Sequence, residues 1–272
     1  MLPIGLNHMT VPSASATALM DIAQALGCVG VELRNDLGAP LFDGQSAAAI
    51  GAAAKARGMR ILALAEVYGF NDNTDASRKA VHDLALQARE CGAEAIALIP
   101  RVFEAPLARP RQRQLLREAL IALQTVLETT GQVGLIEPLG FENSSLRFKE
   151  DVAEVLDDLG GPACFGMIHD TFHHALAQET SVFADLTQAV HISGVADRRV
   201  ALNDMTDAHR GLVDAGDRLG NLQQIAALQA QGYTGAYSFE AFAPDVHALN
   251  DPAAALSASI AFITAQGASM VA

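Results

Sequence analysis

The stretch Gly134-Leu-Ile-Glu-Pro-Leu139 is a short apolar run that ends in one carboxylate, Glu137, followed by a proline that stops a strand. The same pattern recurs three times downstream, in residues 165–170, 188–191 and 236–240. These runs end in Asp170, His191 and Glu240. Four successive apolar segments therefore each present one metal-binding group at their C-terminal end.

Strand and helix patterns alternate along the whole chain. Apolar runs predict eight strands, at 3–6, 29–33, 60–65, 95–99, the stretch bearing Glu137, 165–170, 188–191 and 236–240. Helical spacing of apolar residues predicts helices at 13–26 (capped by Ser13), 45–57, 77–91, 110–130, 146–159, 181–186, 222–230 and 252–264. The strand centres are roughly 33 residues apart, which fits one strand–helix unit each.

This alternation predicts a single (β/α)₈ barrel domain over residues 1–272. The strands are continuously apolar, as parallel strands covered on both faces are, and a barrel of this kind takes about 250 residues. An open doubly wound sheet is the alternative. Neither G-x-G-x-x-G after the first strand nor a phosphate-binding G-x-x-x-x-G-K-[ST] occurs, and this absence disfavours the open sheet.

Composition excludes several classes of partner. The chain has 18 basic and 31 acidic residues, a net charge of −13, and no basic cluster that could follow a phosphate backbone, so we expect no nucleic-acid binding. No apolar run approaches the about 20 residues that cross a bilayer, and the N-terminus has no signal-peptide pattern, so we expect a cytoplasmic protein without a membrane partner. Three widely spaced cysteines indicate neither a disulfide framework nor a thiolate zinc site. A homo-oligomer remains open, because the helices offer apolar faces but no marked interface.

The four strand-end groups predict a metal site. In a (β/α)₈ barrel the C-terminal ends of the strands form the active-site rim, so Glu137, Asp170, His191 and Glu240 should converge there. Three carboxylates brought together repel one another, and a divalent cation relieves that repulsion. Mixed oxygen and nitrogen ligands suit Mn²⁺, Zn²⁺, Co²⁺ or Mg²⁺. A solvated loop charge is the alternative reading for any one of these residues taken alone.

Four further residues are candidates for substrate binding. His173 lies three residues after Asp170, and Arg198 lies in the long connection over residues 193–218, where Arg199 is an alternative. Tyr68, on the loop after the third strand, could form an apolar wall, and His8 ends the first strand. The competing readings are a packing histidine, a solvated arginine and a tyrosine that covers the barrel rim.

Other polar residues in the same regions carry weaker predictions. Glu32 and Glu66 also end strands and could line a pocket, whereas we expect His169 and His174 to be structural. Loops as long as the 193–218 connection are often lids or disordered.

The motifs that carry these residues resemble a known family. They are Leu62-Ala-Leu-Ala-Glu-Val-Tyr-Gly-Phe-Asn71, Ile136-Glu-Pro-Leu-Gly140, His169-Asp-Thr-Phe-His173, Val190-His-Ile-Ser193 and Ser238-Phe-Glu-Ala-Phe242. Their order is similar to that in the xylose-isomerase-like barrel family of sugar isomerases and epimerases, with the greatest likeness to inosose (2-keto-myo-inositol) isomerases of inositol catabolism. The likeness covers nearly the whole chain.

The resemblance implies site roles. It places the metal on Glu137, Asp170, His191 and Glu240, and substrate contacts on His173 and an arginine after the seventh strand. In related ketose epimerases that arginine sits one residue nearer the histidine than Arg198 does. The resemblance also implies that Glu137 and Glu240 exchange protons with carbon.

The expected reaction is the isomerisation or epimerisation of a sugar or cyclic polyol ketone. The ketone would chelate the divalent ion through its carbonyl and a neighbouring hydroxyl and react through a metal-bound cis-enediolate. Returning the proton to the adjacent carbon isomerises the sugar, and returning it to the opposite face of the same carbon epimerises it.

Two other functions use the same residues. One is a metal-dependent dehydratase of the 3-dehydroshikimate dehydratase type, in which the enolate expels a β-hydroxyl. The other is a non-catalytic sugar-binding barrel. Endonuclease-type relatives carry extra histidines and a basic face, and this chain lacks the basic face.

Overall fold

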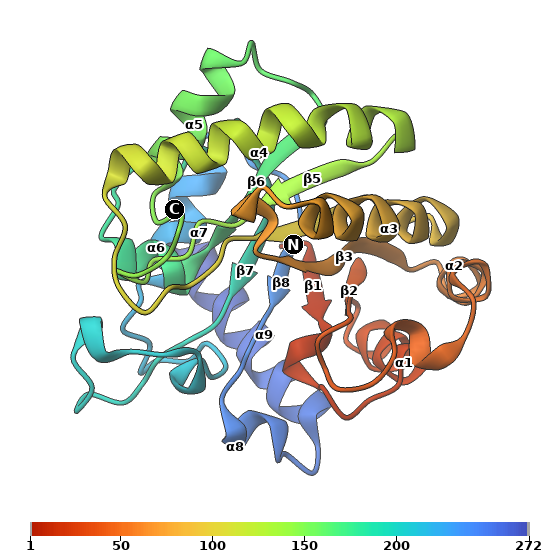
Figure 1. Ribbon diagram of the computed structural model, residues 1–272. Coiled ribbons are helices and arrows are strands. Elements are labelled where there is room, and N and C mark those ends of the chain that lie inside the picture. The colour runs from red at the N-terminus through yellow and green to blue at the C-terminus, as the bar shows by residue number, and fades with distance from the viewer. Residues whose placement is uncertain (1, 271–272) are drawn as a thin grey trace.

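Eight parallel strands close into one barrel, in the order in which they occur along the chain, which confirms the predicted (β/α)₈ fold. The computed structural model describes residues 2–270, without the side chains of 267–270, so residues 1 and 271–272 of the predicted domain lie outside the described part. Helices surround the strands (Figure 1). The strands are β1 (Ile4–Asn7), β2 (Gly30–Arg34), β3 (Arg60–Tyr68), β4 (Ala95–Ile99), β5 (Val133–Ile136), β6 (Phe165–Asp170), β7 (Thr187–Ile192) and β8 (Tyr237–Phe239).

Nine α-helices occur in the described residues. They are α1 (Ala16–Ala25), α2 (Ala47–Ala56), α3 (Asp75–Cys91), α4 (Arg109–Thr130), α5 (Lys149–Asp158), α6 (Thr171–Ala177), α7 (Asn221–Ala230), α8 (Pro244–His247) and α9 (Pro252–Met270). Side chains start several of them: Ser46 Oγ accepts the Ala49 amide, and Thr74 forms a capping box with Ser77. Within residues 2–270, no helix is long and apolar enough to cross a membrane.

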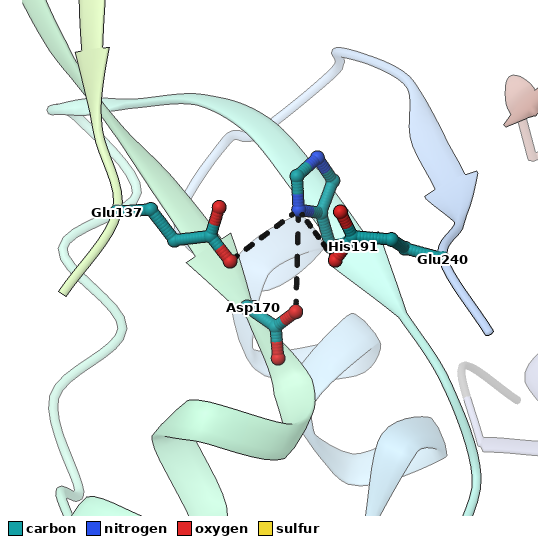
Figure 2. Close-up of side chains that lie close together, drawn as sticks. All are labelled: Glu137, Asp170, His191 and Glu240. Atoms are coloured by element: carbon teal, nitrogen blue, oxygen red, sulfur yellow. Dashed lines mark ion pairs between the residues drawn. The ribbon is translucent and has the colours of Figure 1, made fainter. Parts of the chain in front are cut away.

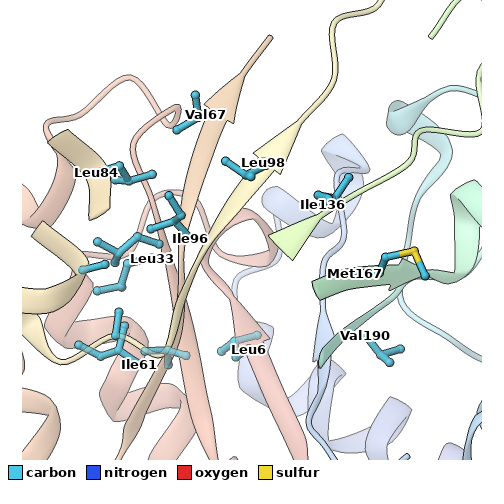
Figure 3. Packing of buried hydrophobic residues seen from close by; sticks show 14 of the residues in the cluster. Leu6, Leu33, Ile61, Val67, Leu84, Ile96, Leu98, Ile136, Met167 and Val190 are labelled. Atoms are coloured by element: carbon cyan, nitrogen blue, oxygen red, sulfur yellow. The ribbon is translucent and has the colours of Figure 1, made fainter. Parts of the chain in front are cut away.

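Strand parity divides the barrel into an apolar outside and a functional inside. Successive side chains of a strand point to opposite faces. Outward residues pack beneath the helices in the main core, among them Leu6, Leu33, Ile96, Ile136, Met167 and Val190 (Figure 3). Inward residues form a separate small cluster that includes Ala95, Ala97, Leu135 and Ile168. Glu137 and Asp170 share the inward parity of Leu135 and Ile168, which directs them into the barrel.

The structure corrects three local predictions. Residues 181–186 form a turn rather than a helix, with Phe183 in the left-handed region at a φ of 52°. The helix after β6 is instead α6, whose first turn is capped by Asp170. The cap of α1 is Ser15 and not Ser13, since its hydroxyl accepts the Ala18 amide. In addition, β3 continues to Tyr68 beyond the predicted end at residue 65, because its last residues pair with β4.

The connection from β7 to α7 is ordered by its own contacts. Gly194 and Gly211 form an antiparallel bridge that closes its base. Two 3₁₀ turns follow within it, Leu202–Asp204 and Asp207–His209. Val195, Met205 and Leu219 form a small buried cluster with Phe172 and Leu176 of α6. The connection therefore packs on α6 and forms part of the barrel mouth.

Candidate metal centre and cavity

Four side chains converge at the C-terminal end of the barrel. Glu137 and Glu240 directly follow β5 and β8, while Asp170 and His191 lie in β6 and β7. All four are buried, and one ligand atom from each lies within 4.8 Å of the others. His191 Nδ1 is 3.2 Å from Glu240 Oε2, 3.5 Å from Glu137 Oε1 and 4.0 Å from Asp170 Oδ2. Figure 2 shows Glu137 and Glu240 approaching this nitrogen from opposite sides.

The backbone holds the two glutamates in the sheet although they lie past the strand ends. The amide of Glu137 donates to the Leu98 carbonyl of β4 at 3.1 Å. The amide of Glu240 donates to the Ile192 carbonyl of β7 at 3.0 Å. Both carboxylates therefore have a backbone position that is fixed by the neighbouring strand.

Asp170 has two separate roles. Its Oδ1 accepts the amides of Phe172 at 2.7 Å and His173 at 2.9 Å, which caps the first turn of α6. Its Oδ2 faces His191 and also accepts a hydrogen bond from Arg210. The cap thus sets the direction of the carboxylate and starts the helix that carries His173.

The orientation of His191 is set by Glu32. The two side chains are each about 1% exposed, and His191 Nε2 lies 2.9 Å from Glu32 Oε2. Because a carboxylate only accepts, Nε2 carries the proton of the neutral imidazole, and in that form Nδ1 keeps a lone pair that can bind a metal ion. Nδ1 is buried and has no hydrogen-bond partner among the described residues. A buried nitrogen lone pair facing three carboxylates fits the donor set of a divalent metal ion.

Two buried arginines compensate the acidic cluster. Arg210 Nη2 donates to Asp170 Oδ2 at 2.5 Å and to Glu240 Oε2 at 2.7 Å. Arg34 Nη1 donates to the other oxygen of Glu240 at 2.7 Å and also binds Asp36 and Glu66. Glu240 is therefore held at both oxygens by guanidinium groups.

The carboxyl groups have different pKa values despite similar burial. Burial raises the pKa of Glu137 to about 7 and also raises that of Asp170. Burial also disfavours the charged form of Glu240, but His191, Arg210 and Arg34 hold its pKa well below the usual range. Burial lowers the pKa of His191, whereas Glu240, Glu32 and Glu137 outweigh it and leave that pKa well above 6.5. These directions describe the four side chains with no ion among them.

The cluster opens into a cavity of about 500 Å³, the inner cavity. Glu137, Glu240 and His173 line it together with the arginines Arg34 and Arg210. Its other lining residues are Asp36, Glu66, Tyr68, Ile99, Val102, Leu139, Phe141, Asn143, Thr206, Asp207 and Phe242. This mixture of apolar walls and a few convergent polar groups is typical of small-molecule sites.

Two of the four predicted substrate-binding residues line this cavity and two do not. His173 and Tyr68 are in its wall. His8 Nε2 is bonded to the Ala14 carbonyl at 2.8 Å, and the residue borders a different, smaller cavity. Arg198 is exposed and absent from the lining, because the chain turns outward after Val195 and reaches the cavity again only at Thr206 and Asp207. Arg210, directly before the Gly194–Gly211 bridge, provides the inward guanidinium.

The sequence predicts no role for Arg34 or Arg210, and it predicts Glu32 only as pocket lining. Parity was an available signal for two of them, since Glu32 and Arg34 are two residues apart in β2 and point to the same face. Glu66, also predicted only as lining, does line the cavity, and burial raises its pKa to about 7. No local pattern marks Arg210, which lies in an irregular connection.

His169 and His174 lie outside the inner cavity, as predicted for structural residues. Lys149 Nζ is 2.9 Å from His169 Nδ1 and 2.7 Å from His174 Nδ1. His169 Nε2 lies 2.8 Å from Gln224 Oε1 of α7. This buried polar cluster joins α5, β6, α6 and α7 behind the metal-ligand candidates.

Comparisons with known proteins agree with this architecture. A family model described as "Xylose isomerase-like TIM barrel" matches residues 20–266. A xylose isomerase domain-containing protein from Salmonella typhimurium is 28% identical, with 97% of each chain covered and a TM-score of 0.88. The IOLI protein, solved with a bound zinc atom, is 15% identical, with 97% of this chain and 99% of that chain covered and a TM-score of 0.84.

A 3-keto-D-glucoside 4-epimerase from E. coli is 17% identical, with 97% of this chain and 100% of that chain covered and a TM-score of 0.71. Likeness at such low identity bears on the fold alone. No curated protein sequence matches the chain.

Proposed function

This chain belongs to the xylose isomerase-like TIM barrel family, and on that premise we propose that it is a divalent-metal-dependent isomerase or epimerase of a sugar or cyclic polyol ketone. The observation that carries the proposal is the buried cluster of Glu137, Asp170, His191 and Glu240, with the unpartnered His191 Nδ1 at its centre. The 3-keto-D-glucoside epimerase and the zinc-containing IOLI structure among its structural neighbours are consistent with it.

The four side chains would hold one ion, of Mn²⁺, Zn²⁺, Co²⁺ or Mg²⁺. Three carboxylate oxygens and one imidazole nitrogen suit all four ions, and their convergence in a buried site offsets the repulsion among the carboxylates. When bound, such an ion polarises a carbonyl group and stabilises the negative charge that develops on its oxygen.

Glu137 and Glu240 are the groups placed to move protons. They reach the cluster from opposite sides (Figure 2). A ketone bound between them would therefore have one carboxylate on each of its two faces. A proton removed by one glutamate and returned by the other inverts a carbon, whereas return to the adjacent carbon moves the carbonyl. Arg34 and Arg210 hold Glu240 in the ionised form that accepts a proton.

The inner cavity is suited to a neutral, hydroxyl-rich ring. His173 is buried in its wall, and burial lowers the pKa of its imidazole to about 3, so it is neutral at physiological pH and can bond a hydroxyl. Phe141, Phe242 and Tyr68 provide apolar surface for the C–H faces of a ring.

The first experiment is elemental analysis of the purified protein and of Glu137→Ala, each after incubation with Mn²⁺ or Zn²⁺. We expect about one ion per chain in the wild type and a large loss in the variant. Proton exchange at the carbon next to the carbonyl is then followed by NMR in deuterated water, with inososes and ketohexoses as substrates.

Glu240→Gln should abolish that exchange and leave the circular dichroism spectrum unchanged. Glu94→Gln, at an exposed ion pair with Arg60, is the matched control and should exchange normally. Normal exchange in Glu240→Gln would overturn the assignment. Release of a conjugated product absorbing in the ultraviolet would instead identify a dehydratase.

A further inference from the structure

A second cavity of about 540 Å³ adjoins the inner cavity; we term it the outer cavity. The two share three wall residues, Phe141, Asn143 and Thr206. The rest of the outer cavity is lined by the loops after β4 and β5, by Leu176 of α6, and by residues 203–206 of the connection from β7 to α7. The two cavities therefore meet at these residues, so a substituent on a ligand in the inner cavity lies next to the outer one.

The shared wall is held in place by contacts of its own. The Phe141 ring packs edge-on against Phe172 and His173, with centroids 6.1 and 5.1 Å apart. The Asn143 side chain donates to the Phe103 carbonyl, and the Phe103 amide donates back to the Asn143 carbonyl at 2.9 Å. A wall that is fixed before binding costs little ordering entropy when a ligand is bound.

The chemistry of the outer cavity suits neutral hydroxyl groups. Glu104, Glu142 and Asp204 line it with acceptors, and Asn143 and Asn203 add amides. Phe141, Leu176 and Met205 provide apolar surface beside them. Apolar surface interleaved with hydrogen-bonding groups matches the alternating C–H and O–H surface of a sugar.

Charge argues against an anionic ligand in the same place. Three carboxylates line the outer cavity against one guanidinium, that of Arg147. One of its nitrogens, Nη2, donates to the Leu176 carbonyl at 3.2 Å and the group lies over the Phe148 ring, while Nε is buried without a hydrogen-bond partner among the described residues. A phosphate or carboxylate would meet a lining whose net charge is negative, because three carboxylates outnumber this one cation.

The volumes of the two cavities, about 500 and 540 Å³, indicate how much of a ligand each could hold. Ligand cavities in proteins span about 300 to 1,000 Å³, so the inner cavity alone is large enough for a single ring. We propose that the outer cavity is a subsite for a neutral glycosyl substituent, so that the substrate is a glycosylated ketone rather than a free monosaccharide or a sugar phosphate. This inference rests on the proposed function, since it places the ketone in the inner cavity.

The test uses D-fructose and its glucosides at O3, O4, O5 and O6, namely turanose, maltulose, leucrose and palatinose, with fructose 6-phosphate as the anionic counterpart. Affinities for the Mn²⁺-loaded protein are measured by calorimetry, and saturation-transfer NMR reports which ring touches the protein. We expect at least one glucoside to bind 10-fold or more tightly than fructose, with saturation of its glucosyl protons. Fructose 6-phosphate should bind no more tightly than fructose.

A pair of variants separates the subsite from the metal site. Asn203→Trp fills the outer cavity from an exposed position, and should remove the preference and the glucosyl saturation while the affinity for fructose is kept. Ala201→Trp, an exposed position on the same connection outside that lining, should behave as wild type.

Three results would overturn the subsite. They are saturation of the fructosyl ring alone, no saturation of either ring, or tighter binding of the phosphate than of every glucoside. The first leaves the proposed isomerase intact. Conversely, glucosyl saturation that depends on Asn203, together with no carbon-bound proton exchange in any ketone, would overturn the proposed isomerase and keep the subsite.

Discussion

At the scale of single residues, the candidate site depends on how each acidic group is paired. His191 faces Glu137, Asp170 and Glu240 through Nδ1, because its Nε2 donates a hydrogen bond to Glu32 on the other side of the ring. The sequence identified the four facing groups from their positions at strand ends. It did not identify their partners, since pairing depends on which inward side chains meet across the barrel.

Glu32 should therefore influence metal affinity without contacting the metal. Glu32→Leu removes the acceptor for His191 Nε2 and frees the imidazole to rotate, so we expect the affinity for Mn²⁺ or Zn²⁺ to fall about 10- to 100-fold. Glu32→Gln keeps an acceptor and should lie at the small end of that range. Titration calorimetry measures both, and affinities equal to that of wild type would show that Glu32 has no positioning role.

Arg210 should matter most when the metal is absent. It is 1% exposed and pairs with Asp170 and Glu240, so Arg210→Met leaves two buried carboxylates less compensated. We expect metal-free Arg210→Met to lose about 3 to 5 kcal/mol of unfolding free energy in urea. Bound metal should restore part of that loss. Arg199→Met, at an exposed position, should change stability by less than about 0.5 kcal/mol. A metal-free Arg210→Met as stable as wild type would refute this compensation.

At the scale of elements, strands were easier to locate than the helices around the site. Eight apolar runs located the strands, whereas residues 181–186 have helical apolar spacing but fold as a turn. The start of α6 depends on Asp170, which was assigned as a metal ligand and not as a helix cap. A motif that marks Asp170 as a metal ligand gives no sign that the same carboxylate also caps a helix.

The loop after β5 should tolerate no side chain where it crosses α6. A Cβ at Gly140 would lie 2.2 Å from the His173 carbonyl oxygen and 2.7 Å from Leu176 Cβ. Gly140→Ala must therefore displace α6, and we expect a loss of about 1 to 3 kcal/mol together with weaker substrate binding through His173. Gly211→Ala is the control for stability, since its Cβ would meet no atom closer than 3.6 Å. Equal denaturation midpoints for Gly140→Ala and Gly211→Ala would contradict the close contact between Gly140 and α6.

At the scale of the whole molecule, the barrel followed from alternation and strand composition, because closed parallel topology repeats one local unit. The residues that the sequence could not place, Arg210 foremost, come from the irregular segment between β7 and α7. Its path is determined by packing of Val195, Met205 and Leu219 on α6, which is a tertiary property with no periodic signature.

Global stability should depend on pH through Lys149. Burial lowers the pKa of Lys149 to about 8 from 10.5, although Glu179 and Asp170 oppose the shift. Between these values the unfolded chain binds more protons than the folded chain, so this group makes stability rise as pH increases from about 8 to 10.5. Below pH 8 the burial of charged Lys149 lowers the free energy of unfolding by its full amount, about 3 kcal/mol.

Lys149→Met isolates this contribution. The unfolding free energy of wild type minus that of the variant should rise by about 3 kcal/mol over that interval, because subtraction removes groups common to both proteins. The neighbours His169 and His174 have pKa values that are lowered by burial and titrate below the interval. A difference in unfolding free energy that does not change with pH would show that burial does not lower the pKa of Lys149.

The segment between β7 and α7 also limits how this barrel can be re-engineered. Residues 203–206 line the outer cavity, while Asp207 and Arg210, a few residues on, belong to the inner cavity and to the charge balance of the cluster. Replacing the whole segment between β7 and α7 with that of a relative would alter substrate choice and cation binding together. An exchange confined to residues 200–205, with the Gly194–Gly211 bridge and Thr206 retained, would leave the inner cavity in place and change only the substituent that is accepted.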